Sequence, residues 1–255
     1  MPGTLTLVGT PIGNLSDLSP RALEALEACD FIAAEDTRVT LRLLTHFGIK
    51  KPLVSYFEHN RRERGEQICA RLLAGEAAVL VTDAGMPAVS DPGQDLVALC
   101  HERQIPVTCV PGPTAALTAL ALSGLPTGRF TFEGFLAMNK KNRRAHLEEL
   151  RQERRTMIFY EAPHKLTATL RDLRDTFGPE RRISLCRELT KLHEEVRRTT
   201  LGETEVTVSA PKGQGMHRMD VLTLLTFVWP QVQAVFPRNP PKLLIVGAGS
   251  PMWKG

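Results

Sequence analysis

Residues 77–93, AAVLVTDAGMPAVSDPG, constrain the possible folds more than any other stretch of the sequence. Residues 77–82 are an apolar run that ends in a threonine, which is typical of a strand buried on both faces of a parallel sheet. The run stops in a loop rich in glycine, proline and aspartate. In open α/β folds such a loop lies at the carboxyl edge of the sheet, where ligands bind. The stretch therefore predicts a buried parallel strand followed by a ligand-binding loop.

The loop itself is built from residues that restrict the backbone. Gly85 has no Cβ, so the backbone there can approach a ligand closely. Pro87 and Pro92 stiffen the chain, and less ordering entropy is then lost on binding. Asp83 and Asp91 supply acceptors. An ordinary strand-to-helix turn with a capping aspartate needs fewer such residues, so the sequence favours a binding loop.

Length and composition limit the class of protein. A chain of 255 residues forms one large domain or two of ordinary size. The net charge of +4 is compatible with an anionic partner. The five cysteines share no Cys-x-x-Cys spacing, so we expect reduced thiols in a cytoplasmic protein, without a disulfide frame or a metal site. We expect neither a signal peptide nor a membrane helix, because the apolar runs are too short.

The first half alternates short apolar runs with amphipathic segments of about ten residues. The predicted strands are residues 4–8, 31–34, 53–56, 77–82 and 107–110. The predicted helices are residues 20–28, 40–47, 66–74 and 94–103. This alternation predicts a parallel sheet with helices on both faces.

Three of the predicted strands end in loops of unusual composition: residues 9–15 (GTPIGNL), 83–93 and 111–115 (PGPTA). The first loop lacks the third glycine of a dinucleotide fingerprint, and none carries the Gly-Lys-Ser/Thr of a phosphate-binding loop. Nicotinamide chemistry and nucleotide hydrolysis are therefore disfavoured. A cleft of glycine, proline, aspartate and threonine suits an adenosine or an amino-acid tail better than a triphosphate.

The second half carries a basic run at residues 139–155, which holds seven Lys or Arg against three Glu. One interpretation is the solvated face of an amphipathic helix. The other is a patch that contacts RNA phosphates through Lys140, Lys141, Arg143 and Arg144. The run contains no aromatic residue, which argues against base stacking within it. We also predict strands at 129–136, 157–160 and 183–186, and a helix at 166–177.

Seven segments, in this order, resemble the tetrapyrrole-methylase superfamily of class III S-adenosylmethionine-dependent methyltransferases. Within it, the resemblance is to the ribosomal RNA small subunit methyltransferase I family. The segments are residues 8–19 (VGTPIGNLSDLS), 34–38 (AEDTR), 83–93, 111–115, 132–136 (FEGFL), 159–166 (FYEAPHKL) and 187–203 (RELTKLHEEVRRTTLGE).

The resemblance implies a two-domain α/β fold, with a parallel sheet in the first domain, a mixed sheet in the second and the cofactor in the cleft between them. It implies methylation of the ribose 2′-hydroxyl of a cytidine in 16S ribosomal RNA near the decoding centre, by a homodimer. The expected partner is the small ribosomal subunit. Methylation of a small tetrapyrrole by the same fold is an alternative, and the basic run argues against it.

The resemblance also suggests roles for individual residues. We expect S-adenosylmethionine to be bound by Pro11, Asp83, Ala84, Gly85, Thr114, Ala115 and Tyr160. We expect a proton acceptor among Glu35, Asp36 and Glu161, of which Asp36 and Glu161 are our catalytic candidates. We expect Asn14 to orient the substrate and Arg38 to contact the RNA, together with the four cations of the basic run.

We divide the chain into a first domain at 1–115, a second at 116–213 and an atypical tail at 214–255. The family continues with a strand that completes the second sheet, and this chain departs from that pattern. Residues 221–229 are an apolar run that could replace the strand. Residues 243–249 imitate a nucleotide-loop strand without room for its helix, so we expect no such role for them. If the closing strand is absent, the sheet has an unpaired edge, and the chain could be a catalytically impaired RNA-binding homologue.

Overall fold

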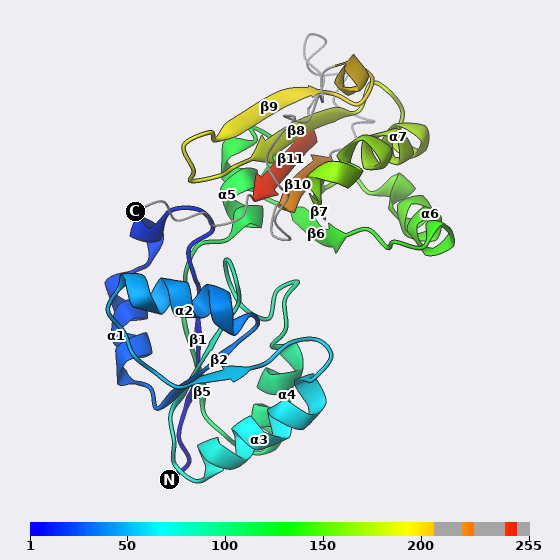
Figure 1. Ribbon diagram of the computed structural model, residues 1–255. Coiled ribbons are helices and arrows are strands. Elements are labelled where there is room, and N and C mark those ends of the chain that lie inside the picture. Colours follow the sequence, from blue (N-terminus) through cyan, green and yellow to red (C-terminus); the bar gives the residue numbers. More distant parts are fainter. Residues whose placement is uncertain (207–220, 227–242, 249–255) are drawn as a thin grey trace. The chain divides into compact units, whose positions relative to one another are not determined.

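The structure is a computed structural model that describes residues 1–206, 221–226 and 243–248, the last two segments by their backbone. The chain divides into two compact units, Met1–Thr114 and Ala115–Gly255. Each unit contains one sheet with helices packed against it (Figure 1). The units are described one at a time.

The sheet of the first unit has five parallel strands in the order β3-β2-β4-β1-β5. They are β1 (Leu5–Val8), β2 (Phe31–Ala34), β3 (Leu53–Ser55), β4 (Ala78–Val81) and β5 (Val107–Val110). Every residue of β2 and of β4 is buried, because helices cover both faces of the sheet. The parallel sheet predicted from the apolar run is thus confirmed.

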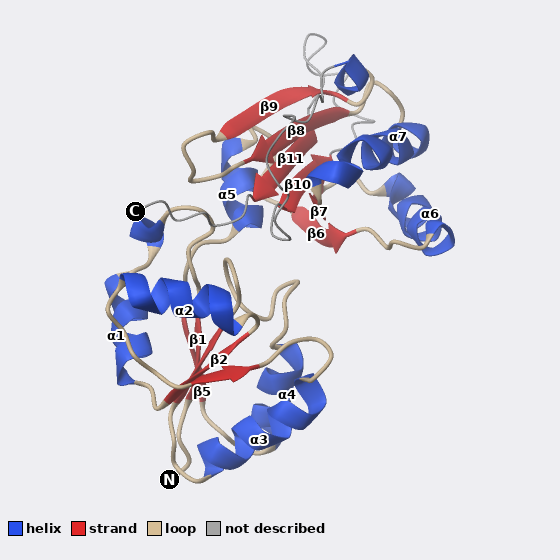
Figure 2. Cartoon of the chain, viewed as in Figure 1, coloured by secondary structure: helices blue, strands red, loops and turns tan. Residues whose placement is uncertain are grey.

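The helices of the first unit form two layers around this sheet (Figure 2). Helices α1 (Pro20–Ala28) and α2 (Thr37–His46) pack on one face, with Leu26 and Leu44 in the same core cluster as Ile32. Helices α3 (Arg61–Leu73) and α4 (Gln94–Glu102) pack on the other face, in a cluster that includes Phe31. Alternate residues of β2 therefore face opposite cores, as the period of a strand requires.

Helices α2 and α3 begin earlier than the sequence pattern predicts. Helix α2 begins at Thr37 because the Asp36 carboxylate accepts a hydrogen bond from the Arg38 N–H at 2.8 Å and caps the helix. Helix α3 begins at Arg61, and its first four residues are exposed arginine and glutamate. An exposed first turn carries no apolar periodicity, so the pattern gave no sign of it.

The second unit contains a six-stranded mixed sheet. Its strands are β6 (Phe130–Phe135), β7 (Thr156–Glu161), β8 (Arg182–Arg187), β9 (Glu195–Thr200), β10 (Val221–Thr226) and β11 (Leu243–Ala248). Strand β7 pairs with β6 in parallel and with β10 antiparallel. Strand β11 pairs antiparallel with β10 and parallel with β8, which in turn pairs antiparallel with β9.

Helices α6 (Lys140–Glu149) and α7 (Leu166–Phe177) cover one face of this sheet, with Leu147 and Leu170 packed in a cluster around Phe159. Helix α5 (Ala115–Leu122) lies beside β10 and β11. Short 3₁₀ turns occupy Leu15–Asp17, Leu150–Gln152, Pro163–Lys165 and Glu203–Val206. The arrangement matches the mixed sheet expected for a second domain.

Two segments of the predicted tail are strands of the second sheet. Residues 221–226 form β10, so the apolar run does pair with β7 where a closing strand was expected. Residues 243–248, for which the sequence offered only a likeness to a nucleotide-loop strand, form β11. Its parallel pairing with β8 uses the extended apolar backbone and needs no following helix. Residues 207–220, 227–242 and 249–255 lie outside the described residues.

Candidate functional site

The loops after β1, β4 and β5 converge at the carboxyl edge of the first sheet. Thr10 and Gly85 form an isolated bridge in which each N–H donates to the other carbonyl, at 2.9 and 3.0 Å. A Cβ on Gly9 would lie 2.7 Å from the Gly112 Cα, so these backbones are in direct contact. The Met86 sulfur accepts a hydrogen bond from the Gly112 N–H at 3.2 Å. The three loops singled out in the sequence are therefore held together.

The backbone of residues 83–93 is left-handed at four positions. Gly85 and Gly93 have φ values of +90° and +144°, and Ala88 and Ser90 have values of +66° and +65°. A Cβ at Gly93 would lie 2.9 Å from a Leu80 methyl group. Left-handed backbone strains residues that carry a Cβ, and such strain is concentrated at functional sites.

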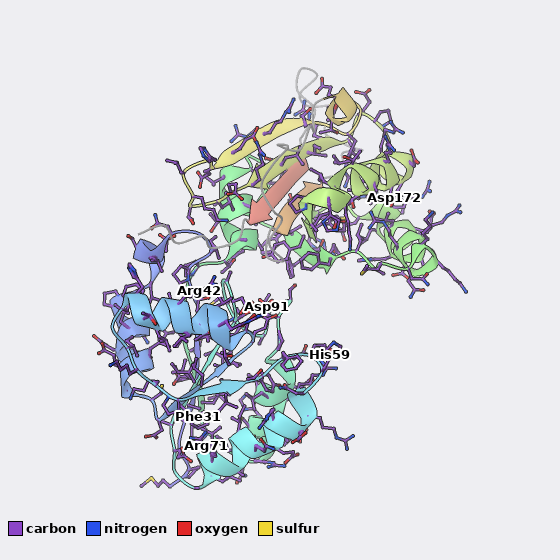
Figure 3. All side chains as sticks on the ribbon, viewed as in Figure 1. Phe31, Arg42, His59, Arg71, Asp91 and Asp172 are labelled. Atoms are coloured by element: carbon purple, nitrogen blue, oxygen red, sulfur yellow. The ribbon has the colours of Figure 1, made fainter. Side chains whose placement is uncertain are left out.

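Carboxyl groups gather beside Thr82 at the ends of β2 and β4. The Thr82 hydroxyl donates to the Glu35 carboxylate at 2.6 Å, and the Asp36 N–H donates to the Asp83 carboxylate at 3.0 Å. Asp91 lies toward the same end of the sheet, whereas Phe31 and Arg71, in cation–π contact, lie toward the other (Figure 3). Carboxyls that are crowded and partly buried disfavour one another's charge.

This crowding changes proton affinities. Burial, together with the nearby charge of Glu35, raises the pKa of Asp83 to about 7. The same two causes raise the pKa of Asp91 to about 7. By contrast, the hydrogen bonds from Arg38 lower the pKa of Asp36 to about 2. A group that titrates near neutral pH suits proton transfer, so Asp83 and Asp91 suit this role better than the predicted Asp36.

These shifts predict that the first unit is more stable in mild acid than in mild base. An unfolded aspartate has a pKa of about 4, so the folded state holds protons on Asp83 and Asp91 that the unfolded chain has lost. Their contribution is fully present below about pH 4 and is lost as the pH rises through about 7. We expect the free energy of unfolding, measured by urea denaturation, to fall less over this range in Asp83→Asn/Asp91→Asn. The exposed Asp95→Asn is the control, and an unchanged pH profile in the double variant would contradict the assignment.

Asp36 and Arg38 form an ion pair at the start of α2. The Arg38 guanidinium donates to both Asp36 oxygens, at 3.0 and 2.6 Å. The Arg38 side chain is 85% exposed, and that of Asp36 is 27% exposed. Arg38 is therefore accessible from solvent while Asp36 stays ionised beneath it, and the contact of Arg38 with RNA stays a prediction.

Glu161, the other catalytic candidate, is buried among polar partners of the second unit. Its carboxylate accepts hydrogen bonds from the Thr169 hydroxyl and from the Ala162 N–H, the latter at 2.8 Å. Arg143 lies 3.7 Å from it. The Glu161 side chain is only 5% exposed, so it has no free access to a substrate, and the contacts point to a positioning role.

Arg143 does not lie with the exposed cations where the sequence placed it. Its guanidinium donates to the Asp172 carboxylate at 2.5 Å and to the Thr169 hydroxyl at 2.7 Å, and its side chain is 14% exposed. Asp172 lies on α7 (Figure 3). Arg143 therefore ties α6 to α7 and is already neutralised by protein carboxylates.

The other predicted cations of α6, Lys140, Lys141 and Arg144, are exposed. Within the described part of the chain they form no ion pair, whereas Arg151 further along pairs with Glu148 at 2.8 Å. Three neighbouring unpaired cations make a surface that is suited to phosphates.

The remaining predicted residues are divided between the two units. Pro11 is buried in the loop after β1, and Ala84 and Thr114 are half-buried. Ala115 begins α5 of the second unit. The Asn14 side chain accepts a hydrogen bond from the Ser16 N–H at 3.0 Å and caps a 3₁₀ turn, which is a structural role.

Tyr160 lies at the end of β7 in the second unit, and its hydroxyl accepts a hydrogen bond from the Ala116 N–H at 3.2 Å. Sequence reasoning missed Thr10 and Thr82, which bridge the strand ends. The Thr10 hydroxyl donates to the Thr82 carbonyl at 3.1 Å. The available signal was Thr82 directly after one apolar run and Thr10 one glycine after another.

Membrane-spanning helices and metal sites are absent from the part of the chain that the structure describes. No helix among the described residues is both long enough and apolar enough to cross a membrane. No group of three or more His, Cys, Asp or Glu side chains among these residues could hold a metal ion.

Solved structures with the same architecture include diphthine synthase, with a TM-score of 0.65 at 15% identity over 82% of this chain and 87% of that one. Uroporphyrin-III C-methyltransferase from Thermus thermophilus, complexed with S-adenyl homocysteine, has a TM-score of 0.57 at 20% identity over 92% of this chain and 100% of that one. At these identities the likeness shows the fold.

Sequence relatives are much closer. The ribosomal RNA small subunit methyltransferase I of Synechocystis sp. is 53% identical over 215 residues, which cover 83% of this chain and 77% of the relative. The protein of the same name from Pseudomonas aeruginosa is 49% identical over 212 residues, which cover 83% of this chain and 75% of that relative. Residues 4–205 match the model of the tetrapyrrole (corrin/porphyrin) methylases. The chain therefore belongs to the tetrapyrrole methylases and, within them, to the ribosomal RNA small subunit methyltransferase I family.

Proposed function

We propose that this protein uses S-adenosylmethionine to methylate the ribose 2′-hydroxyl of a cytidine in 16S ribosomal RNA, near the decoding centre. The observation that carries the proposal is the 53% identity to a relative named ribosomal RNA small subunit methyltransferase I. We further propose that it acts in the cytoplasm, as a homodimer, on the small ribosomal subunit.

The carboxyl edge of the first sheet fits S-adenosylmethionine in two respects. The left-handed Gly85, with Ile12 and the Pro113 carbonyl 3.5 Å from its Cβ position, allows a backbone approach that a larger residue would block. The crowded carboxyls of Asp83 and Asp91 favour a cation, and the sulfonium carries a positive charge.

We assign the methionine end of the cofactor to the backbone of residues 83–85 and 114–115, with Pro11 beside it. When bound, S-adenosylmethionine supplies an activated methyl group, so the main task of the protein is alignment. A ribose hydroxyl is a weak nucleophile and needs a proton acceptor, for which Asp83 and Asp91 have suitable pKa values. The role of Tyr160 at the cofactor stays a prediction.

An RNA substrate is supported by the exposed, unpaired cations Lys140, Lys141 and Arg144 on α6. A free tetrapyrrole does not need such a surface. The strands β10 and β11 also supply the second sheet with the closing pairings whose absence would have suggested an impaired homologue.

The test is transfer of tritiated methyl groups to under-methylated small ribosomal subunits, with free 16S RNA and a free tetrapyrrole assayed beside them. We expect label in the RNA and one cytidine whose following phosphodiester resists alkali, because a methylated 2′-oxygen cannot attack it. Labelled RNA without an alkali-resistant position would mean that a base is methylated. Label in the tetrapyrrole alone, or cofactor binding without transfer, would overturn the proposal.

A further inference from the structure

Three aromatic side chains gather at the carboxyl ends of the neighbouring parallel strands β6 and β7. Phe132 and Phe135 each meet the Tyr160 ring edge-on, with centroid distances of 5.1 and 5.6 Å. Phe135 and Tyr160 are direct partners in the strand register. The Tyr160 hydroxyl is held by the Ala116 N–H, so the centre of this aromatic cluster is fixed.

A β-bulge turns Phe135 outward. The register between β6 and β7 shifts between Phe132 and Gly134, and Gly134 has φ of +60°. Beyond the bulge, Leu136 packs in the core of the second unit, while Phe135 is 49% exposed. Bulges commonly re-aim a side chain beside a functional site. The bulge and the fixed Tyr160 ring together set the position of Phe135. Its exposed ring is therefore pre-organised to contact a ligand.

The chain passes from this cluster directly to the unpaired cations of α6. Lys140 lies five positions after Phe135 along the chain, a path of at most about 18 Å. Lys141 and Arg144 follow on the same helix. An aromatic face beside lysine and arginine is the arrangement that holds single-stranded nucleic acid, by base stacking and phosphate contact. Protein interfaces, in contrast, are depleted in lysine.

We propose that Phe135 is a stacking platform for an unpaired base of the RNA substrate, whose neighbouring phosphates lie on Lys140, Lys141 and Arg144. The inference rests on the proposed function and adds to it the mode of substrate recognition. It supplies the aromatic residue that the basic run lacks, because that residue belongs to the preceding strand.

The experiment compares Phe135→Ala, Phe135→Trp and Lys140→Glu/Lys141→Glu with the wild type. Binding of a single-stranded 16S RNA fragment is measured at several salt concentrations, and the KM for under-methylated subunits is measured in parallel. We expect Phe135→Ala to weaken binding about tenfold without changing the salt slope, because stacking releases no counterions. Phe135→Trp should restore binding. Lys140→Glu/Lys141→Glu should make RNA affinity depend less steeply on salt concentration, because fewer phosphates are neutralised.

Phe130→Ala is the matched control, because Phe130 is 38% exposed at the other end of the same strand and should leave RNA affinity unchanged. The inference is overturned if Phe135→Ala binds RNA like the wild type. It is also overturned if the variant loses S-adenosylmethionine affinity, or if it changes the sedimentation of the protein, which would identify a contact with a second copy. Failure of the wild type to methylate RNA would instead count against the proposed function.

Discussion

Gly85→Val is expected to abolish the binding of S-adenosylmethionine. Gly85 has φ of +90°, which a β-branched residue rarely adopts. Its Cβ position already lies 3.5 Å from an Ile12 methyl carbon and from the Pro113 carbonyl oxygen. The two γ-methyl groups of valine would extend beyond that point into the place we assign to the cofactor. Titration calorimetry should therefore register no binding at concentrations that saturate the wild type.

Gly48→Val separates this effect from backbone strain. Gly48 also has a left-handed φ, of +70°, but a Cβ there would meet no atom within 4 Å. Both variants should lose stability through strain, by about 1–2 kcal/mol. Only the Gly85 variant should lose the cofactor. Wild-type affinity in a folded Gly85→Val protein would place the cofactor elsewhere.

The architecture of the first unit could be predicted because its sheet is buried on both faces. Strand β4 consists of four apolar residues followed by Thr82 and a loop that contains Gly85 and Gly93, and such an unbroken apolar run is typical of a parallel strand that is buried on both faces. The start of α2 was misplaced because Asp36 acts there as a cap. The sequence pattern favoured a catalytic role for Asp36, whereas in the structure its side chain caps the N-terminus of α2.

For the charged candidate residues, the sequence did not show which side chains are buried and which are exposed, because charge alone does not determine burial. Arg143, Leu147 and Leu150 are spaced at i, i+4 and i+7, and this spacing places the arginine on the apolar face of α6. This spacing indicates a buried Arg143, but the many cations around it favoured the interpretation of an exposed basic patch. No local pattern could show that its partners would be Glu161 on β7 and Asp172 on α7, because those contacts depend on the tertiary fold.

The tail was difficult for a related reason. Strands β10 and β11 pair with each other and with β7 and β8, which are distant in sequence. A short apolar run that fits several partners does not specify its register. Gly247, which contributes to the likeness to a nucleotide loop, lies within β11.

Arg143→Met is expected to destabilise the second unit by roughly 3–5 kcal/mol, since removing one partner of a buried ion pair leaves the other uncompensated. Asp172 is 46% exposed and can be solvated when the arginine is lost. The Glu161 side chain is only 5% exposed, so water cannot solvate its carboxylate when the arginine is lost. The cost therefore falls mainly on Glu161. Urea denaturation of the whole chain, followed by circular dichroism, measures it.

A double-variant cycle tests that explanation. Arg143→Met/Glu161→Gln should recover part of the lost stability, because an amide needs no cation and its oxygen can still accept from the Ala162 N–H. Arg144→Met, one residue along on the exposed face, should change stability by no more than about 0.5 kcal/mol. If Arg143→Met is as mild as Arg144→Met, the buried pair does not fix α6. The exposed cations of α6 would then lose the anchor that sets their position on the sheet.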